Sequence, residues 1–176
     1  ENFLSEVHGR DNLTTAELAI GEDLKFLALR IRTLANVGAY VSSFGAQVPA
    51  MSGSRAPTGV YAIPVLDHEV RMIHTHTAPV DAYRGAGRPE MGYLIERTVS
   101  KAAAELGVDP VELRRRNYIK PEQMPYPNPV GQTYDCGKFE HVLDELLGSA
   151  DWNGYAARKK AAEARGKLYG RGLASY

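Results

Sequence analysis

Hydrophobic and polar residues alternate along three stretches in the first half of the chain, as in strands that are buried on one face. Residues 13–20 are compatible with a strand, residues 21–23 supply a polar turn, and residues 24–33 alternate as the return strand of a hairpin. Residues 65–74 predict a third strand. The intervening residues 44–58 are rich in Gly, Ala, Ser and Pro, which suits a tightly packed connection with a short helix.

Helical spacing begins after the third strand and a loop. Pro89 stands where a helix can start, apolar side chains then recur every three or four residues, and Gly107 marks the end. Asp109 followed by Pro110 predicts a capped start for a short helix that runs toward Asn117.

The last third of the chain completes an α+β prediction. An extended loop with four prolines is expected at 120–134, helices at 139–147 and 152–165, and a truncated strand at 168–176. Three strands, several helices and long loops favour the α+β class over a doubly wound sheet.

Length and charge agree with one domain of an ordinary globular protein. The chain has 176 residues, is 44% hydrophobic, and carries 21 basic and 21 acidic residues. The zero net charge gives no general attraction to nucleic acid or to an anionic membrane. We expect one partial domain over 1–176, strand-rich in 1–90 and mainly helical in 91–176.

The single cysteine, Cys136, excludes an internal disulfide and a cysteine-built iron–sulfur cluster within the chain. A reducing, cytoplasmic setting is therefore the default expectation. No apolar run approaches the length of about 18 residues that a membrane-spanning helix needs. The chain begins with Glu1, and we expect it to be an internal segment of a longer subunit.

Residues 80–90 combine glycines, arginines and a predicted helix start. Gly85 and Gly87 permit positive φ angles and a close approach of the backbone to a ligand. Arg84 and Arg88 carry permanent positive charge and donors that match phosphate or oxo groups. The helix start adds unpaired N–H groups and the positive end of a dipole. This pattern predicts an anion-binding loop, although a glycine turn with surface ion pairs explains the spacing equally well.

The run Asp-Ala-Tyr-Arg-Gly-Ala-Gly-Arg-Pro-Glu at 81–90 closely resembles the active-site loop of molybdenum hydroxylase large subunits, the xanthine dehydrogenase and aldehyde oxidase superfamily. It is most similar to the branch of form II aerobic carbon monoxide dehydrogenase large subunits. Further similar blocks follow in the family's order at 8–11, 32–40, 59–64, 113–117 and 133–135. The resemblance covers nearly the whole chain and implies part of a molybdopterin-binding domain.

The resemblance implies that Arg84, Gly85, Ala86, Gly87 and Arg88 bind a molybdopterin-type molybdenum cofactor, in its cytosine dinucleotide form. It implies hydroxylation of a small substrate with water-derived oxygen, and electron transfer through iron–sulfur clusters to FAD in partner subunits or domains. The expected assembly is a dimer of heterotrimers. The family's general-base glutamate comes from near the end of the large subunit. We therefore expect no catalytic and no metal-ligating residue here, and an inactive isolated chain.

Three positions restrict the substrate under this resemblance. Gly85 stands where carbon monoxide oxidisers carry the cysteine of a copper-bearing site. Ala86 stands where purine oxidisers carry an aromatic ring that stacks on the substrate. Ungapped spacing also places Ser52 where the purine enzymes use a substrate-facing arginine. Neither carbon monoxide nor a purine is the expected substrate.

Neighbouring polar residues have structural explanations. Glu90 stands in the first turn of a predicted helix, where the helix dipole favours a carboxylate, so we expect no catalytic role for it. His74 and His76 are expected to make polar contacts in the loop. Tyr83 should pack beneath the loop with its hydroxyl bonded. The arginines at 114–116 are expected to form a solvated helix face.

Two other classes of function compete with the cofactor-binding interpretation. One is an independent phosphate- or nucleotide-binding module that uses the loop Gly85–Arg88, although the chain lacks a Walker-type Gly-Lys-Ser/Thr and a Rossmann glycine triplet after a strand. The other is a structural or interaction domain in which the loop is only a turn.

Overall fold

A three-stranded sheet forms the centre of the computed structural model, which describes residues 6–176. β1 (Asn12–Ile20) pairs antiparallel with β2 (Phe26–Gly38), and β2 pairs in parallel with β3 (Val65–His74). The predicted hairpin and third strand are confirmed. The return strand is longer than the predicted 24–33, because its parallel pairing with β3 continues to the end of both strands.

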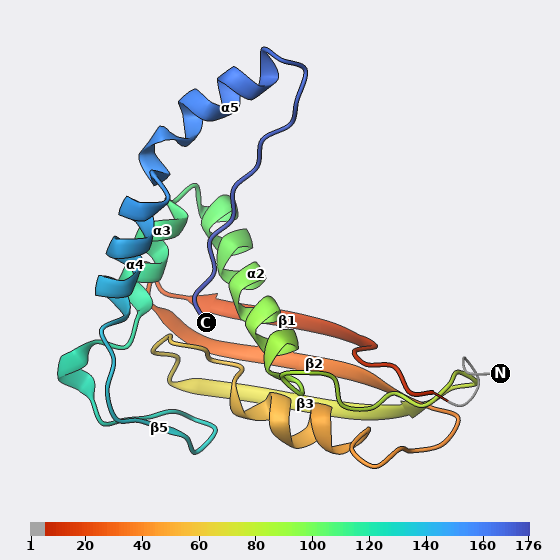
Figure 1. The fold of residues 1–176 in the computed structure, drawn as a ribbon. Coiled ribbons are helices and arrows are strands. Elements are labelled where there is room, and N and C mark those ends of the chain that lie inside the picture. Colours follow the sequence, from red (N-terminus) through yellow and green to blue (C-terminus); the bar gives the residue numbers. More distant parts are fainter. Residues whose placement is uncertain (1–5) are drawn as a thin grey trace.

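Two helices follow the sheet in the order that the sequence predicts. α2 (Arg88–Leu106) lies on one face of the sheet, and α3 (Pro110–Asn117) comes directly after it (Figure 1). Gly107 ends α2 with a φ of +65°. Asp109 caps α3, since its carboxylate accepts hydrogen bonds from two backbone N–H groups of the first turn at 2.8 and 3.0 Å.

The remaining elements are short. They are the helical turns Val48–Ser52, Gly53–Arg55, Pro121–Gln123 and Trp152–Gly154, the strands β4 (Tyr126–Pro127) and β5 (Thr133–Tyr134), and the helices α4 (Phe139–Ser149) and α5 (Tyr155–Glu163). The proline-rich loop at 120–134 therefore contains a two-residue antiparallel pairing. Within the described part of the chain, no helix is long and apolar enough to cross a membrane.

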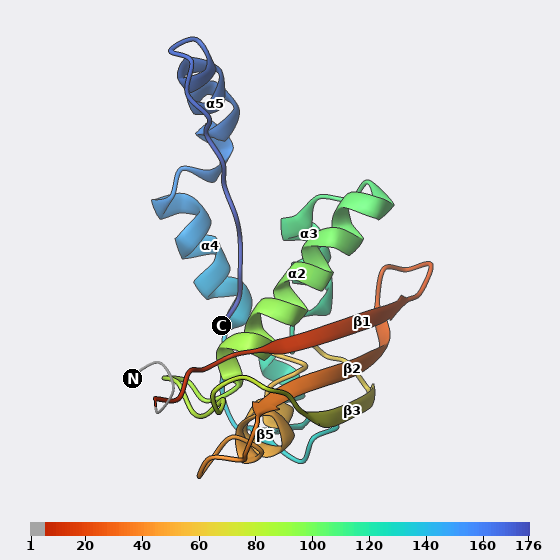
Figure 2. The ribbon, with the colours of Figure 1, turned by 90° about the vertical axis from the view of Figure 1, so that its right-hand side faces the viewer.

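The prediction of a strand at 168–176 is wrong. This segment has no regular secondary structure and runs back from α5 past α4 to the side of α2 (Figures 1 and 2). Side chains of the α3 region hold it, because Arg114 donates to the carbonyl of Leu173 at 3.0 Å and Tyr118 shares a 2.6 Å hydrogen bond with Ser175. A local alternation pattern does not reveal whether a partner strand is available.

The hydrophobic core lies between α2 and the sheet. From Leu29 to Val37, β2 alternates, with Leu29 and Ile31 buried while Arg30 is exposed. The buried stripe of α2 repeats at helical spacing and consists of Met91, Ile95, Val99 and Ala103. The two periodicities match the two elements, which confirms the α+β prediction.

A buried ion pair links α2 to α3, and the prediction of a solvated arginine at 114 is wrong. The Arg114 side chain is 0% exposed. Its guanidinium donates to Glu96 Oε2 from Nε at 3.0 Å and from Nη2 at 2.7 Å, and Nη2 also lies 3.0 Å from Ser100 Oγ. Tyr61 donates its hydroxyl to Glu96 Oε1 at 2.5 Å. Burial raises the pKa of Tyr61 far above its ordinary value, so the hydroxyl remains a donor.

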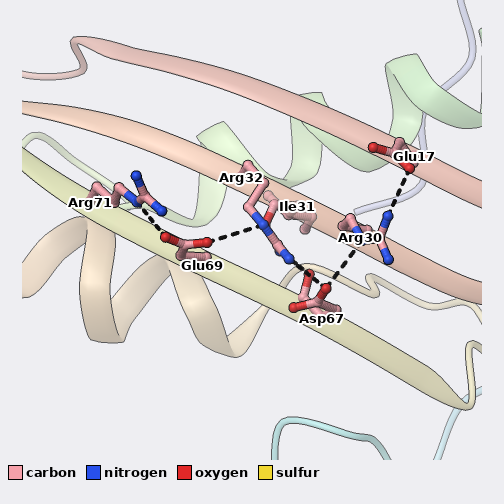
Figure 3. Close-up of polar contacts among 7 residues, drawn as sticks. All are labelled: Glu17, Arg30, Ile31, Arg32, Asp67, Glu69 and Arg71. Carbon is pink, nitrogen blue, oxygen red and sulfur yellow. Dashed lines mark hydrogen bonds and ion pairs between the residues drawn. The ribbon is translucent and has the colours of Figure 1, made fainter.

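The opposite face of the sheet carries an exposed ladder of ion pairs (Figure 3). Its members alternate in sign across the three strands and are Glu17, Arg30, Arg32, Asp67, Glu69 and Arg71. Asp67 lies at its centre, 2.6 Å from Arg32 and 3.1 Å from Arg30, and these guanidinium groups lower the pKa of its carboxyl. Exposed pairs of this kind contribute little to stability, so the ladder keeps this face polar rather than holding the fold together.

Replacing Arg114 by methionine should destabilise the chain strongly. Arg114→Met leaves the Glu96 carboxylate buried without its cation, which costs about 3–5 kcal/mol. Arg116→Met is the matched control, because Arg116 pairs with Glu112 on the exposed side of the same helix and should change stability by no more than about 0.5 kcal/mol. Urea unfolding followed by circular dichroism measures both, and equal losses would contradict the assignment.

Candidate functional site

The predicted glycine–arginine loop is anchored at its start by Asp81. The backbone N–H of Asp81 donates to the carbonyl of His8 at 2.8 Å. Its carboxylate accepts hydrogen bonds from the N–H groups of Phe44 at 3.1 Å and Ala82 at 2.6 Å, and from the Ser42 hydroxyl. The Ser42 bond first, and then the two backbone bonds, lower the pKa of Asp81. The carboxylate is therefore ionised at neutral pH and keeps these bonds.

Three consecutive left-handed residues shape the loop. Gly85, Ala86 and Gly87 have φ angles of +92°, +44° and +91°. The N–H of Ala86 donates to the carbonyl of Tyr83 at 2.7 Å, and the N–H of Arg88 donates to that of Gly85 at 3.1 Å. Left-handed backbone is costly for Ala86, so the surrounding contacts must impose this conformation.

Close contacts explain why the loop needs glycine at 85 and 87, the first with Pro89 and the second with the preceding connection. A Cβ on Gly87 would lie 2.7 Å from the nitrogen and 2.8 Å from the Cα of Gly53, and a Cβ on Gly85 would lie 2.6 Å from Cγ of Pro89. The helical turns Val48–Ser52 and Gly53–Arg55 thus lie directly against the loop. The predicted tightly packed connection is confirmed, and its contact with the loop is information that only the tertiary structure supplies.

The loop carries hydrogen-bond donors and charges that have no partner among residues 6–176. Arg84 and Arg88 are exposed, and neither forms an ion pair with another residue of the range 6–176. Within that range, no acceptor receives the backbone N–H of Gly85 or Gly87. The N-terminus of α2 begins at the same place. These donors and charges suit an anionic ligand, whereas the simple turn with paired arginines is not what the described residues form.

The prediction that Tyr83 packs beneath the loop is wrong. The residue is 61% exposed, and its ring faces the guanidinium of Arg10, whose Cζ lies 4.6 Å from the ring centroid. Arg10 also lies 3.5 Å from Glu90, which stands in the first turn of α2 as expected. His74 makes a polar contact with the carbonyl of Gly38 at 3.1 Å, as predicted.

Arg10 is the residue of the site that the sequence did not indicate. Its block at 8–11 stood out only as part of a resemblance, and the groups that it contacts lie more than 70 positions away in the chain. No local pattern can report a contact at that separation.

Metal-ligating side chains do not gather in the described part of the chain. Among residues 6–176 no group of three or more His, Cys, Asp or Glu side chains is placed to hold a metal ion. Cys136 is exposed on a separate segment after β5.

Comparison with known proteins gives consistent matches. The family model described as "Molybdopterin cofactor-binding domain" matches residues 1–118. The carbon monoxide dehydrogenase large chain of Hydrogenophaga pseudoflava is 33% identical, and the nicotine 6-hydroxylase large subunit of Paenarthrobacter nicotinovorans is 29% identical. Each match covers 100% of this chain and 22% of the relative. The chain thus spans about a fifth of the length of these proteins.

Solved structures agree with the sequence matches. The crystal structure of quinoline 2-oxidoreductase from Pseudomonas putida 86 is similar with a TM-score of 0.85 and 32% identity, covering 94% of this chain and 21% of that one. The structure of a Cu,Mo-containing CO dehydrogenase is similar with a TM-score of 0.80 and 33% identity, covering 95% and 22%.

Replacing Gly87 by alanine should destabilise the chain more than the same replacement at Gly107. Gly107→Ala is the control, because Gly107 also has a positive φ but has no atom within 4 Å of the added Cβ. Its left-handed strain alone costs about 1–2 kcal/mol. Gly87→Ala adds a clash with backbone, for which a further loss of about 1–3 kcal/mol is expected. Equal unfolding midpoints of the two variants in urea would show that the contact with Gly53 is unimportant.

Proposed function

We propose that this chain, which belongs to the molybdopterin cofactor-binding domain family, is part of the cofactor-binding subunit of a molybdenum-dependent hydroxylase. One observation carries the proposal at the level of the site. Exposed guanidinium groups of Arg84 and Arg88, without an ion pair among residues 6–176, flank a left-handed glycine loop at the start of α2. The names of similar proteins, a nicotine 6-hydroxylase and carbon monoxide dehydrogenases, support the same reaction class.

The residues of the loop fit an anionic pterin ligand. Arg84 and Arg88 would bind its phosphate or oxo groups, and the N–H groups of Gly85 and Gly87 would donate to it. Ala86 presents only a methyl group toward the ligand space. We propose the cytosine dinucleotide form of the cofactor. When bound, the cofactor supplies the metal centre at which water-derived oxygen is transferred to the substrate.

The residues of this chain bind and orient; they do not supply the base. Asp81 and the connection at 48–55 keep the loop in one conformation before any ligand arrives, which lowers the entropic cost of binding. We propose that a general base comes from another part of the subunit, and that iron–sulfur and FAD-binding subunits or domains accept the electrons. A cytoplasmic dimer of heterotrimers is the proposed assembly.

The substrate that we propose is a small organic molecule other than a purine, and not carbon monoxide. Gly85 has no thiol for copper, and a side chain at this position would meet the Pro89 ring at 2.6 Å. Ala86 offers no ring for stacking on a purine. The similar nicotine 6-hydroxylase and quinoline 2-oxidoreductase bear the names of other heterocyclic substrates.

Removing the Arg84 guanidinium should weaken cofactor retention in the full-length protein. Arg84→Ala loses a charge-assisted hydrogen bond worth about 1.5–3 kcal/mol, which corresponds to about 10–150-fold weaker binding. Arg165→Ala is the control, because Arg165 is an exposed arginine after α5, remote in the chain from the loop. Molybdenum content and turnover equal to those of the parent in both variants would refute the proposed site.

The 176-residue chain by itself should not hold molybdenum in a one-to-one ratio. The loop provides one wall of the ligand site, and the proposed remaining walls come from parts of the subunit that these residues do not contain. Elemental analysis of the purified chain after expression with molybdate tests this expectation. A stoichiometric content would contradict the division of the site between segments.

A further inference from the structure

Arg10 connects the N-terminal segment to the loop through three different contacts. Nη2 donates a 2.5 Å hydrogen bond to the carbonyl of Arg84. Cζ lies 4.6 Å from the centroid of the Tyr83 ring, and Nε lies 3.5 Å from Glu90 Oε2. One guanidinium thus touches two successive loop residues and the first turn of α2.

The backbone around Arg10 is shaped for this purpose. Arg10 has a φ of +60°, which is uncommon for a residue with a side chain. A Cβ on the preceding Gly9 would lie 2.6 Å from Cβ of Tyr83, so only glycine lets the two segments approach this closely. The N–H of His8 donates to the carbonyl of Pro79 at 3.1 Å, which aligns the segment with the residues that enter the loop.

Glu90 depends on Arg10 for its compensating charge. Its side chain is 16% exposed, and Oε2 is buried with no hydrogen-bond donor among the described residues. A buried carboxylate needs a nearby cation, and within residues 6–176 Arg10 is the ion-pair partner of Glu90. The contact therefore ties the start of α2 to the same guanidinium that holds the Arg84 carbonyl.

We propose that Arg10 is the positioning residue that fixes the backbone of Tyr83 and Arg84, and through it directs the Arg84 guanidinium toward the ligand. Nη2 of Arg10 is bonded to the Arg84 carbonyl and Nε is paired with Glu90, so we assign Arg10 the role of holding the loop rather than of binding the cofactor. The role of Arg10 in fixing the loop conformation does not depend on the proposed function. Its effect on cofactor binding rests on the proposed function.

The experiment compares Arg10→Met with the parent in the full-length protein, assembled with its partners and prepared with and without cofactor. Hydrogen exchange in the cofactor-free form reads the amides of Ala86 and Arg88, which are bonded to loop carbonyls. Both should exchange at least about tenfold faster in the variant because the loop opens more often. Amides of β2 should be unchanged, which verifies that the variant is folded.

The cofactor arm measures molybdenum content and the electron paramagnetic resonance signal of the occupied fraction. Loss of a supporting partner typically weakens metal binding by about 10–100-fold, and we expect Arg10→Met to fall in that range and to alter the signal. Arg10→Lys keeps the charge but only part of the contacts, and it should give intermediate values. Arg30→Met is the matched control, because Arg30 also makes two ion pairs, on the outer face of the sheet (Figure 3).

The outcomes separate the two proposals. Unchanged exchange at Ala86 and Arg88 in Arg10→Met overturns the positioning role, whatever the cofactor data. The positioning role is also overturned if Arg10→Met exchanges faster but keeps its full molybdenum content while Arg84→Ala loses the metal. If Arg10→Met exchanges faster and both Arg10→Met and Arg84→Ala keep their full molybdenum content, the result refutes the cofactor function of the loop instead. Glu90→Gln removes one of the three contacts and should produce a smaller increase at the same two amides, which keeps the test available if Arg10→Met does not fold.

Discussion

The buried ion pair between Arg114 and Glu96 is the constraint on which the arrangement of this chain depends. It joins the middle of α2 to α3, and further bonds from the same guanidinium reach Ser100 and the carbonyl of Leu173. Tyr61 occupies the second carboxylate oxygen. A buried pair repays its desolvation only when the remaining polar atoms are also bonded, and here several are. Because α2 is held in this way, the loop at its N-terminus has a defined position.

The loop itself is fixed by contacts with segments that are distant in the sequence. Asp81 bonds to the backbone and side chain of residues 42–44, Gly87 rests against Gly53, and Arg10 holds the carbonyl of Arg84. The guanidinium groups of Arg84 and Arg88 stay exposed, and the N–H groups of Gly85 and Gly87 have no acceptor in the part of the chain that the structure describes. These groups are left for a ligand. A prearranged surface of donors is what binding an anion requires, because little order must then be gained on binding.

Much of this organisation could be predicted from the sequence, because it follows from local rules. Strand alternation, helical spacing, the cap at Asp109 and the glycine end of α2 are each properties of a few neighbouring residues. The resemblance carried by residues 81–90 is confirmed by the family match over 1–118. The predictions that are wrong concern which distant residues a segment or side chain contacts, not the periodicity of the sequence. The segment at 168–176 alternates without a strand to pair with, and Arg114 lies among neighbours that suggested a solvated face.

The sequence by itself therefore determined most of the elements, the α+β class, the position of the loop and the family, since these depend on periodicity and on a run of contiguous residues. Only the tertiary structure decided which side chains are buried as ions, what touches Tyr83, and which segment supports the glycines. Such contacts join residues separated by tens of positions. Their existence depends on the packing of the whole domain, and no short stretch of sequence encodes it.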